Sequence, residues 1–357
     1  MNTFGKNITF TIFGESHGPA IGGVLGGLPA GFSPDFSHID GYLKRRNHRA
    51  VYATPRAESD AYEILSGLFE GKTNGAPLAF LIRNNDTKSA HYDDLKRCMR
   101  PGHADYPAYV KYGGNADYRG GGHFSGRLTA PLVFAGALAL QLLQARGVRV
   151  CSHILSIGDV TGESLLGTPL DGALFDTLRK SEFPVLDNAL KTRMLDVIKA
   201  AAADKNSVGG VVELIIDGVG AGIGDPFFGS VESRLSAMLF SVPAVKGVEF
   251  GAGFGIAKMT GFDANDAYYM DGGTVKTRTN NNGGILGGIT NGMPVVCRVA
   301  IKPTPSIFQT QDTVDVLSKK DTQLTLKGRH DCCIVPRAAA ALEAAAGLAV
   351  LDMLGGN

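Results

Sequence analysis

One stretch of this chain, residues 128–145, is apolar on nearly every face that a helix would present. It is rich in Ala and Leu, and Gly147 follows it as a stop signal. A helix without a polar face has to be surrounded by protein rather than lie half in solvent. Residues 337–354 form a second Ala-rich stretch of the same kind. We therefore expect two buried helices with the rest of the chain packed around them.

The composition is that of a protein with a sizeable core and no general affinity for polyanions. Of the 357 residues, 44% are hydrophobic and 19% are charged, a balance that disfavours disorder. Thirty-five basic residues against thirty-four acidic ones leave a net charge of +1. This gives no electrostatic reason to expect nucleic acid or a membrane surface as a partner. A phosphorylated ligand would have to meet a local basic cluster.

Several features favour a cytoplasmic protein. The five cysteines are odd in number and lack the paired spacing of a zinc site, which fits reduced thiols and no bound metal. The apolar run 8–13 is short and meets Glu15 at once, so no signal peptide is expected. Residues 128–145 fall short of the roughly 20 clean apolar residues of a membrane span. The positions that interrupt or flank this stretch are Arg127, Pro131, Gln141 and Gln144.

Strand and helix patterns follow one another irregularly, and no low-complexity linker divides them. We therefore expect a single domain over residues 1–357. Predicted strands cover residues 7–13, 61–69, 77–83, 148–160, 208–217 and 294–301. Predicted helices cover residues 38–49 and 231–240, with two more inside 170–203 that break at Phe183-Pro184.

A glycine-dense run at residues 218–224 follows a predicted strand and is similar to a dinucleotide-binding loop. In such a loop the glycines open a helix directly and belong to a βαβ unit. Here Asp225-Pro226 intervenes, and the βαβ alternation is missing around it. We therefore predict no dinucleotide site at this run.

The candidate chemistry lies on other glycine-rich loops. Residues 120–127 place three glycines before Ser125 and Arg127 at the start of the first buried helix, where free N–H groups favour an anion. An ordinary turn with Ser125 as the helix N-cap fits the same pattern. Residues 100–105 supply a cation, an imidazole and a carboxylate within six positions. His17 lies between glycines after the first strand, where it either faces a cavity or is solvated in a turn.

Two basic segments also leave two interpretations open. Residues 44–49, with Arg56 beyond them, form either a solvated face or the positive wall that a small polyanion needs. Residues 302–306 either hold a phosphate or form an extended linker. Three histidines on glycine-flanked or loop positions, several arginines and a carboxylate before a helix together predict general acid–base chemistry on a small polyanion. The sequence contains no nucleophile elbow, P-loop or HExxH motif.

Four motifs, in this order and at these separations, resemble the chorismate synthase family from the first strand to the last helix. They are Gly14-Glu15-Ser16-His17-Gly18, Arg100-Pro101-Gly102-His103-Ala104-Asp105, Asp117-Tyr118-Arg119-Gly120-Gly121-Gly122 and Arg329-His330-Asp331. The resemblance implies an α+β fold, a single-domain β-α-β sandwich with antiparallel sheets and buried central helices. It also implies a cytoplasmic homotetramer.

The resemblance further implies a lyase of the shikimate pathway of aromatic amino-acid biosynthesis. Members of this family convert 5-enolpyruvylshikimate-3-phosphate to chorismate and phosphate by an anti-1,4-elimination, using reduced FMN without net redox change. Two routes to the reduced flavin stay open: reduction by NADPH on the protein itself, or reduction by an external reductase. The implied partners are the small-molecule substrate and reduced FMN, with no nucleic acid and no membrane.

Roles carry over to single positions through this resemblance. His17 would protonate the departing phosphate, His103 would stabilise the reduced flavin by protonation, and Asp331 would act through the flavin in removing the C6 proton. An imidazole, with its usual pKa of about 6.5, suits the neutralisation of a leaving phosphate. The substrate's phosphate and two carboxylates would meet Arg46, Arg49, Arg100, Arg127 and Arg337. The flavin would lie against His123, Phe124, Ser125, Pro243, Ala244, Gly287, Lys302, Pro303, Thr304, Pro305, Ser306 and Arg329.

The chain departs from the family pattern beside the flavin. His123-Phe124 stands where many members have Arg-Ser, and Pro243 replaces a common Asn. Two other functions fit part of the sequence. An NADPH-dependent flavin oxidoreductase would use the glycine loops and basic residues, but the dinucleotide fingerprint is missing. A non-catalytic anion-binding protein would keep the arginines but would have no use for His17, His103 and Asp331 together.

Overall fold

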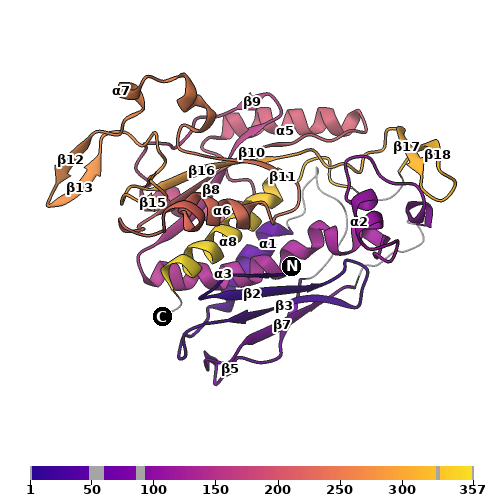
Figure 1. Ribbon diagram of the computed structural model, residues 1–357, viewed down its shortest axis with the longest axis horizontal. Helices are drawn as coiled ribbons and strands as arrows, with labels where there is room; N and C mark the ends of the chain where they lie inside the picture. Colours follow the sequence, from indigo (N-terminus) through magenta and orange to yellow (C-terminus); the bar gives the residue numbers. More distant parts are fainter. Residues whose placement is uncertain (1, 48–59, 86–92, 327–329, 356–357) are drawn as a thin grey trace.

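Two central helices form the middle layer of the molecule (Figure 1). They are α3 (Thr129–Ala145) and α8 (Val335–Leu354), and both are buried over most of their length. The computed structural model describes residues 2–47, 60–85, 93–326 and 330–355. The two apolar stretches of the sequence therefore become core helices, as predicted. One helical stretch of the described residues, Gly126–Ala145, is long and apolar enough to cross a membrane. However, 83% of its most apolar 18-residue segment is buried inside the protein.

A five-stranded sheet lies on each side of the helical layer, and all described strand pairs are antiparallel (Figure 1). The first sheet, in spatial order, consists of β1 (Thr3–Phe4), β2 (Thr9–Gly14), β3 (Ala20–Gly26), β7 (Leu78–Arg83) and β4 (Tyr62–Ile64). The second consists of β11 (Val245–Phe250), β16 (Val295–Ile301), β10 (Gly210–Asp217), β8 (Arg149–Ile157) and β9 (Val160–Thr161). The predicted antiparallel sandwich with buried central helices is confirmed.

Helices on both faces explain why β8 and β10 read as continuous apolar runs rather than alternating ones. Helix α8 contacts their inner face, while α4 (Gly172–Lys180) and α5 (Asn188–Ala203) contact the other side of β8. Helix α3 instead packs on β2, β3 and β7 of the first sheet. The break between α4 and α5 includes Phe183-Pro184, as the sequence predicts.

The remaining helices and turns surround these layers. They are α1 (Phe36–Arg46), α2 (Asp105–Lys111), α6 (Val231–Leu239) and α7 (Gly261–Ala264), with single 3-10 turns η2 (Asp93–Lys96), η3 (Arg119–Phe124), η4 (Gly126–Leu128), η5 (Phe227–Gly229) and η6 (Gly253–Lys258). Four small hairpins complete the described part. They pair β5 (Leu68–Phe69) with β6 (Lys72–Thr73), β12 (Tyr268–Asp271) with β13 (Thr274–Thr277), β14 (Ile285–Leu286) with β15 (Ile289–Thr290), and β17 (Gln311–Asp315) with β18 (Lys320–Leu324).

Several sequence predictions need correction. The strand expected at 148–160 turns back at Gly158, where φ is +56°, so that β9 pairs antiparallel with β8. The strand expected at 61–69 is two short strands, because Gly67 has φ +88° and a side chain there would meet the backbone of Leu78. The hairpins at 268–277 and 311–324 were not predicted, since their strands are exposed and carry little apolar signal. The helix expected at 38–49 is described as far as Arg46, and residues 48–49 lie outside the described part of the chain.

The glycine run 218–224 does not open a helix. Gly222 N–H donates to the carbonyl of Thr290 at 2.9 Å, and Ile223 N–H donates to its hydroxyl at 3.0 Å. The run therefore packs against β15, and the next α-helix, α6, begins only at Val231. This agrees with the prediction that the run is not a dinucleotide loop.

A buried ion pair ties α1 to α8. Arg45 donates through both terminal nitrogens to the two carboxylate oxygens of Glu343, at 2.7 and 2.8 Å, and Glu343 is completely buried. Ser152 of β8 donates to the same carboxylate at 2.6 Å. Three elements thus meet at one buried carboxylate, which fixes the end of α1 from which Arg46 extends.

Helices α3 and α8 cross closely at Gly136. A side chain at this position would come within 2.4 Å of both the backbone and the side chain of Ala344. We expect Gly136→Ala to destabilise the protein by about 2 kcal/mol, because the helices have to separate, and overpacking outweighs the better helix propensity of Ala. Urea unfolding measures this. Gly41→Ala, at an exposed position of α1 with nothing within 4 Å, is the control and is expected to stabilise by up to about 1 kcal/mol. Equal stability of the two variants would contradict the close crossing.

Candidate active site

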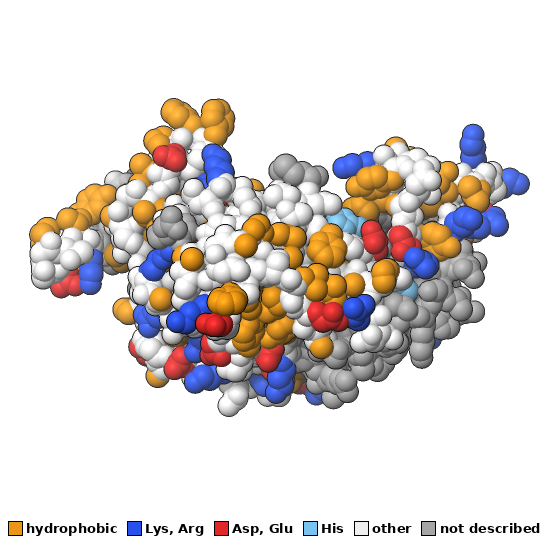
Figure 2. Space-filling view, turned by 90° about the horizontal axis from the view of Figure 1, so that it is seen from below, with side chains coloured by type: hydrophobic (Ala, Val, Ile, Leu, Met, Phe, Trp, Pro, Cys, Tyr) orange, Lys and Arg blue, Asp and Glu red, His pale blue; other side chains and the backbone are white. Residues whose placement is uncertain are grey.

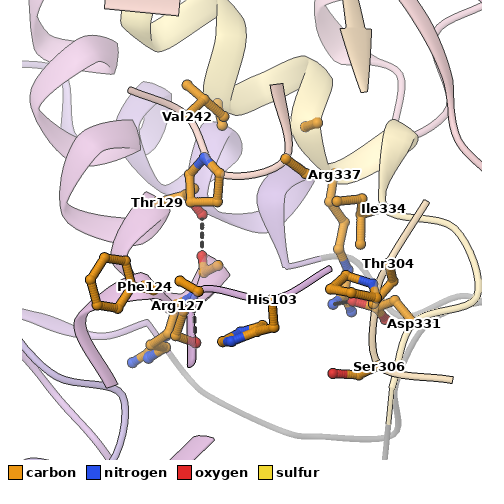
Figure 3. A pocket seen from close by; sticks show the side chains of 18 of the residues that line it. His103, Phe124, Arg127, Thr129, Val242, Thr304, Ser306, Asp331, Ile334 and Arg337 are labelled. Carbon is orange, nitrogen blue, oxygen red and sulfur yellow. Dashed lines mark hydrogen bonds and ion pairs between the residues drawn. The ribbon is translucent and has the colours of Figure 1, made fainter. Parts of the chain in front are cut away.

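A cavity of about 630 Å³ opens where several loops converge on the N-terminal ends of α3 and α8 (Figure 3). Its volume lies within the range typical of small-molecule sites, roughly 300–1,000 Å³. The lining residues are Arg46, Asn47, Arg100, Gly102, His103, Ala104, Gly120, His123, Phe124, Ser125, Gly126, Arg127, Thr129, Ser241, Val242, Pro243, Ala244, Lys302, Thr304, Pro305, Ser306, His330, Asp331, Ile334, Arg337, Ala338 and Ala341. Cationic groups and apolar side chains are thus combined in one cavity.

Two arginines on one wall share a single buried carboxylate. Arg46 donates to Asp60 at 2.5 Å, and Arg127 forms a second ion pair with the same side chain. Burial alone would raise the pKa of Asp60, but the two neighbouring guanidinium groups lower it below its usual value. The carboxylate is therefore ionised, and it holds the two guanidinium groups beside each other at the cavity. Asp60 was not predicted as a site residue.

A second cluster joins Arg100, His103 and Asp105. Arg100 binds both oxygens of Asp105 at 2.7 and 2.8 Å, and His103 Nδ1 lies 2.6 Å from Asp105 Oδ1. Burial by itself would raise the pKa of Asp105, but hydrogen bonds from Arg100 and His103 hold it well below the usual range. An ionised carboxylate only accepts hydrogen bonds, so Nδ1 of His103 carries the donated proton. Nε2 is then the ring nitrogen that Asp105 does not occupy.

A third pair lies at the start of α8. Arg337 donates to Asp331 Oδ2 at 2.9 Å, and Ile334 lines the same wall. Figure 3 shows Asp331 and Arg337 beside Thr304, with His103 projecting into the cavity from another segment. Spacing on α8 explains the apolar part of this wall, because residues three or four apart share a helix face. Ile334, Ala338 and Ala341 follow this spacing and were missed by the sequence analysis, although helical periodicity pointed to them.

Hydroxyl and amine groups line the edge of the cavity near the loop 302–306. Ser306 accepts a hydrogen bond from Arg100 at 3.4 Å, and Lys302 donates to the carbonyl of Gly102. Burial, assisted by the nearby charge of Lys246, lowers the pKa of Lys302. The hydroxyl of Thr304 is buried in the wall without a hydrogen-bond partner among the described residues. A buried hydroxyl of this kind is open to a hydrogen bond with a ligand.

Ser125 is a helix N-cap that also lines the cavity, and anion binding at its motif stays a prediction. Its hydroxyl accepts a hydrogen bond from the backbone N–H of Arg127 at 3.3 Å, which makes it an N-cap of η4, and it also lines the cavity. His123 lines the cavity as well, and its Nδ1 lies 3.1 Å from the carbonyl of Gly14. The basic segment 44–46 is neither a wholly solvated face nor a wholly positive wall, because Lys44 is exposed, Arg45 is in the core and Arg46 lines the cavity.

His17 lies behind the cavity wall rather than among the lining residues. A side chain on Gly120, which does line the cavity, would come within 2.1 Å of the His17 ring. The imidazole is almost fully buried, and Ser16 Oγ lies 3.2 Å from its Nδ1. Gly120 has φ +58°, so glycine serves here for both backbone shape and space. The catalytic role of His17 stays a prediction.

The cavity unites most of the predicted site residues. His103, Asp331, Arg46, Arg100, Arg127 and Arg337 line it, as do His123, Phe124, Ser125, Pro243, Ala244, Lys302, Thr304, Pro305 and Ser306. Gly287 lies in the β14–β15 turn and Pro303 in the adjoining loop, and neither is among the lining residues. Arg49 and Arg329 fall outside the described residues.

The antiparallel sheet–helix–sheet fold and its cationic, histidine-containing cavity are suited to an enzyme that acts on a small anion. Similarity to known proteins identifies the class of enzyme. Residues 8–354 match the chorismate synthase family. A chorismate synthase of Thermococcus gammatolerans is 45% identical over 98% of this chain and 96% of its own length. One of Thermococcus kodakarensis is 43% identical, with the same coverage of both chains. A crystal structure of a chorismate synthase aligns with a TM-score of 0.76 at 28% identity, covering 98% of this chain and 92% of that one.

This chain belongs to the chorismate synthase family. It is therefore a lyase of the shikimate pathway, which serves aromatic amino-acid biosynthesis, and it acts on a small-molecule substrate. The resemblance seen in the four sequence motifs is confirmed.

Proposed function

We propose that the protein converts 5-enolpyruvylshikimate-3-phosphate to chorismate and phosphate by an anti-1,4-elimination, with reduced FMN and without net redox change. One observation carries this proposal: a single cavity is lined by four predicted substrate arginines, His103 and Asp331. The elimination removes a proton from C6 and releases phosphate, so it needs a proton acceptor, a proton donor and cations for a polyanion.

The arginines are not equivalent toward this polyanion. Arg100 is matched by Asp105, and Arg337 is matched by Asp331. Arg46 and Arg127 converge on one carboxylate, that of Asp60. Two guanidinium groups therefore lie side by side at this wall, and we assign to it the binding of a charged group of the substrate.

The cavity also fits FMN. Val242, Pro243, Ile334, Ala338 and Ala341 supply an apolar wall for a flat ring. The buried Thr304 hydroxyl without a protein partner, with Ser125, Ser306 and Lys302, supplies donors for the polar chain and its phosphate. Reduced FMN, when bound, supplies the electron density that eases departure of the phosphate. From the family pattern we also infer that Gly287, Pro303 and Arg329 contact the flavin and that Arg49 contacts the substrate.

Three side chains of the protein would manage the protons. His103 holds a proton on Nδ1 against Asp105, which leaves Nε2 to exchange a proton with the bound flavin. His17 would donate a proton to the leaving phosphate, and Asp331 would be the final acceptor of the C6 proton. One proton is released and one is taken up by these residues, so the reaction is balanced in charge.

Exposed aromatic side chains bear on how copies of this chain assemble. Phe227, Phe228, Phe254 and Phe262 are 86%, 99%, 86% and 92% exposed. Figure 2 shows hydrophobic side chains gathered on the arm at the left, where α7 and β12–β13 lie in Figure 1. Exposed apolar surface of this kind marks interaction sites. We propose that further copies of this chain cover it in a homotetramer. We also propose a cytoplasmic location and a single domain over residues 1–357. The shared hydrophobic core, which includes residues of both sheets, supports the single domain.

An anaerobic assay tests the proposed reaction. With chemically reduced FMN and 5-enolpyruvylshikimate-3-phosphate, the protein should release phosphate and chorismate in equal amounts. With oxidised FMN and NADPH instead, turnover would show that the protein reduces its own flavin, and its absence would assign that step to an external reductase. No product with chemically reduced FMN would refute the proposed function.

A further inference from the structure

One asparagine connects two parts of the site that are far apart in the sequence. Asn84 follows the end of β7 and lies between the loop of residues 15–19 and the side chain of Arg127. Its Nδ2 donates to the carbonyls of Glu15 and Gly18, at 2.9 Å each. Its Oδ1 accepts from Arg127 Nε at 3.1 Å. No role has been given to this residue so far.

The chemistry of its neighbours fixes the orientation of this amide. Two carbonyl oxygens face one end, so that end has to be the NH₂ group. An arginine N–H faces the other end, so that end has to be the oxygen. A flipped amide would lose all three hydrogen bonds. The side chain therefore has one stable orientation, and it determines the separation between the loop and the guanidinium group.

The loop held by Asn84 carries His17. Asn84 N–H also donates to the carbonyl of Pro19 at 3.2 Å, so backbone and side chain together bind both ends of the loop. On the opposite side, Ser16 N–H donates to Gly122 at 3.1 Å. The His17 ring lies between these two attachments, directly behind Gly120.

The guanidinium group held by Asn84 belongs to the wall formed by Arg46 and Arg127. Asp60 binds Arg127 at Nη1, while Asn84 binds it at Nε. Two acceptors at different nitrogens of a planar group fix both its position and its tilt. Asp60 therefore relates Arg127 to Arg46, and Asn84 relates it to the His17 loop.

We propose that Asn84 is a positioning residue for the lyase reaction: it holds the His17 loop and Arg127 at a fixed separation, so that the proton donor meets the substrate bound at the arginine wall. This inference deepens the proposed function and rests on the role given there to His17. A displacement of a reacting group by about 1 Å can lower a rate by about 10²-fold, which makes such a connection consequential.

Asn84→Asp separates the two contacts. The substitution keeps the shape and the acceptor for Arg127, but it turns a carboxylate oxygen toward two carbonyl oxygens and so releases the loop. We expect kcat to fall by roughly 10–100-fold, and the KM for the substrate should rise modestly because the new carboxylate offsets part of the charge of Arg127. The pH profile of kcat should also lose the contribution of His17.

A double-mutant cycle with His17→Ala distinguishes positioning from a general structural fault. If Asn84 acts through His17, Asn84→Asp should cost less than about twofold in the His17→Ala background. Equal costs in both backgrounds would overturn the proposal. Asn84→Ala, which removes both the loop contacts and the contact to Arg127 without adding repulsion, is carried through the same cycle in case the Asp variant does not fold.

Asn115→Asp is the matched control, because its Nδ2 also donates to two carbonyls, those of Tyr112 and Gly113, but on an exposed segment. Its turnover should stay within about twofold of the parent. Normal turnover of Asn84→Asp, with a large loss in His17→Ala, would overturn the inference and leave the proposed function standing. Normal turnover of His17→Ala would overturn the role of His17 and this inference with it.

Discussion

His103→Ala should lower turnover by roughly 10²–10⁴-fold with little change in stability, the loss typical of a missing acid or base. The imidazole lies on the cavity wall with 15% of its side chain exposed, so its removal leaves no large hole in the core. The loss should appear mainly in kcat, because the substitution removes none of the arginines that line the cavity. Steady-state kinetics with chemically reduced FMN measure it, and thermal unfolding checks the fold.

The environment of His103 gives this prediction its physical reason. Asp105 is held ionised by Arg100 and accepts the Nδ1 proton of the imidazole. Since Asp105 stays ionised throughout the neutral range, a pH dependence lost with His103 reports on the imidazole and not on its carboxylate. His38→Ala, on α1 and outside the cavity lining, is the control and should keep turnover within about twofold. Unchanged turnover of His103→Ala would reject its role.

Glu343→Gln should cost about 3–5 kcal/mol of unfolding free energy, because it leaves the Arg45 guanidinium buried without a counter-charge. Both side chains are almost fully buried, at 6% and 0% exposed. The lost pair also releases the end of α1, so the KM for the substrate should rise through Arg46. Urea unfolding gives the stability, and kinetics of the folded fraction give the KM.

Two further sets of substitutions test whether burial of the ion pair causes the loss of stability. Glu63→Gln breaks an exposed pair of the same length, the 2.7 Å contact with Arg83, and should cost less than about 1 kcal/mol. The double variant Arg45→Met and Glu343→Leu removes both charges and should recover most of the stability, because a buried pair seldom exceeds a well-packed apolar replacement. A loss below about 0.5 kcal/mol for Glu343→Gln would show that the pair is not a structural requirement.

The adjacent arginines 45 and 46 show what sequence reasoning can and cannot reach. Their charge and their place at the end of a helix were evident, and so was the choice between a solvated face and a ligand wall. Neighbours on a helix point in directions about 100° apart. Which of the two side chains reaches a buried glutamate, and which reaches the cavity, depends on distant parts of the chain. Glu343, for example, is 298 positions away from Arg45.

Apolar periodicity and motif order in the sequence determined the central helices, the main strands and the family, because these depend on local pattern. The loops at 100–105 and 120–127 were likewise identified by their residue types. Only the tertiary structure decided which partners complete them. Asp60 and Asn84 lie 67 and 43 positions from Arg127, and neither belongs to a motif around it. A carboxylate or amide acquires such a role when packing excludes water and leaves it facing one particular charge, and that is a property of the folded chain.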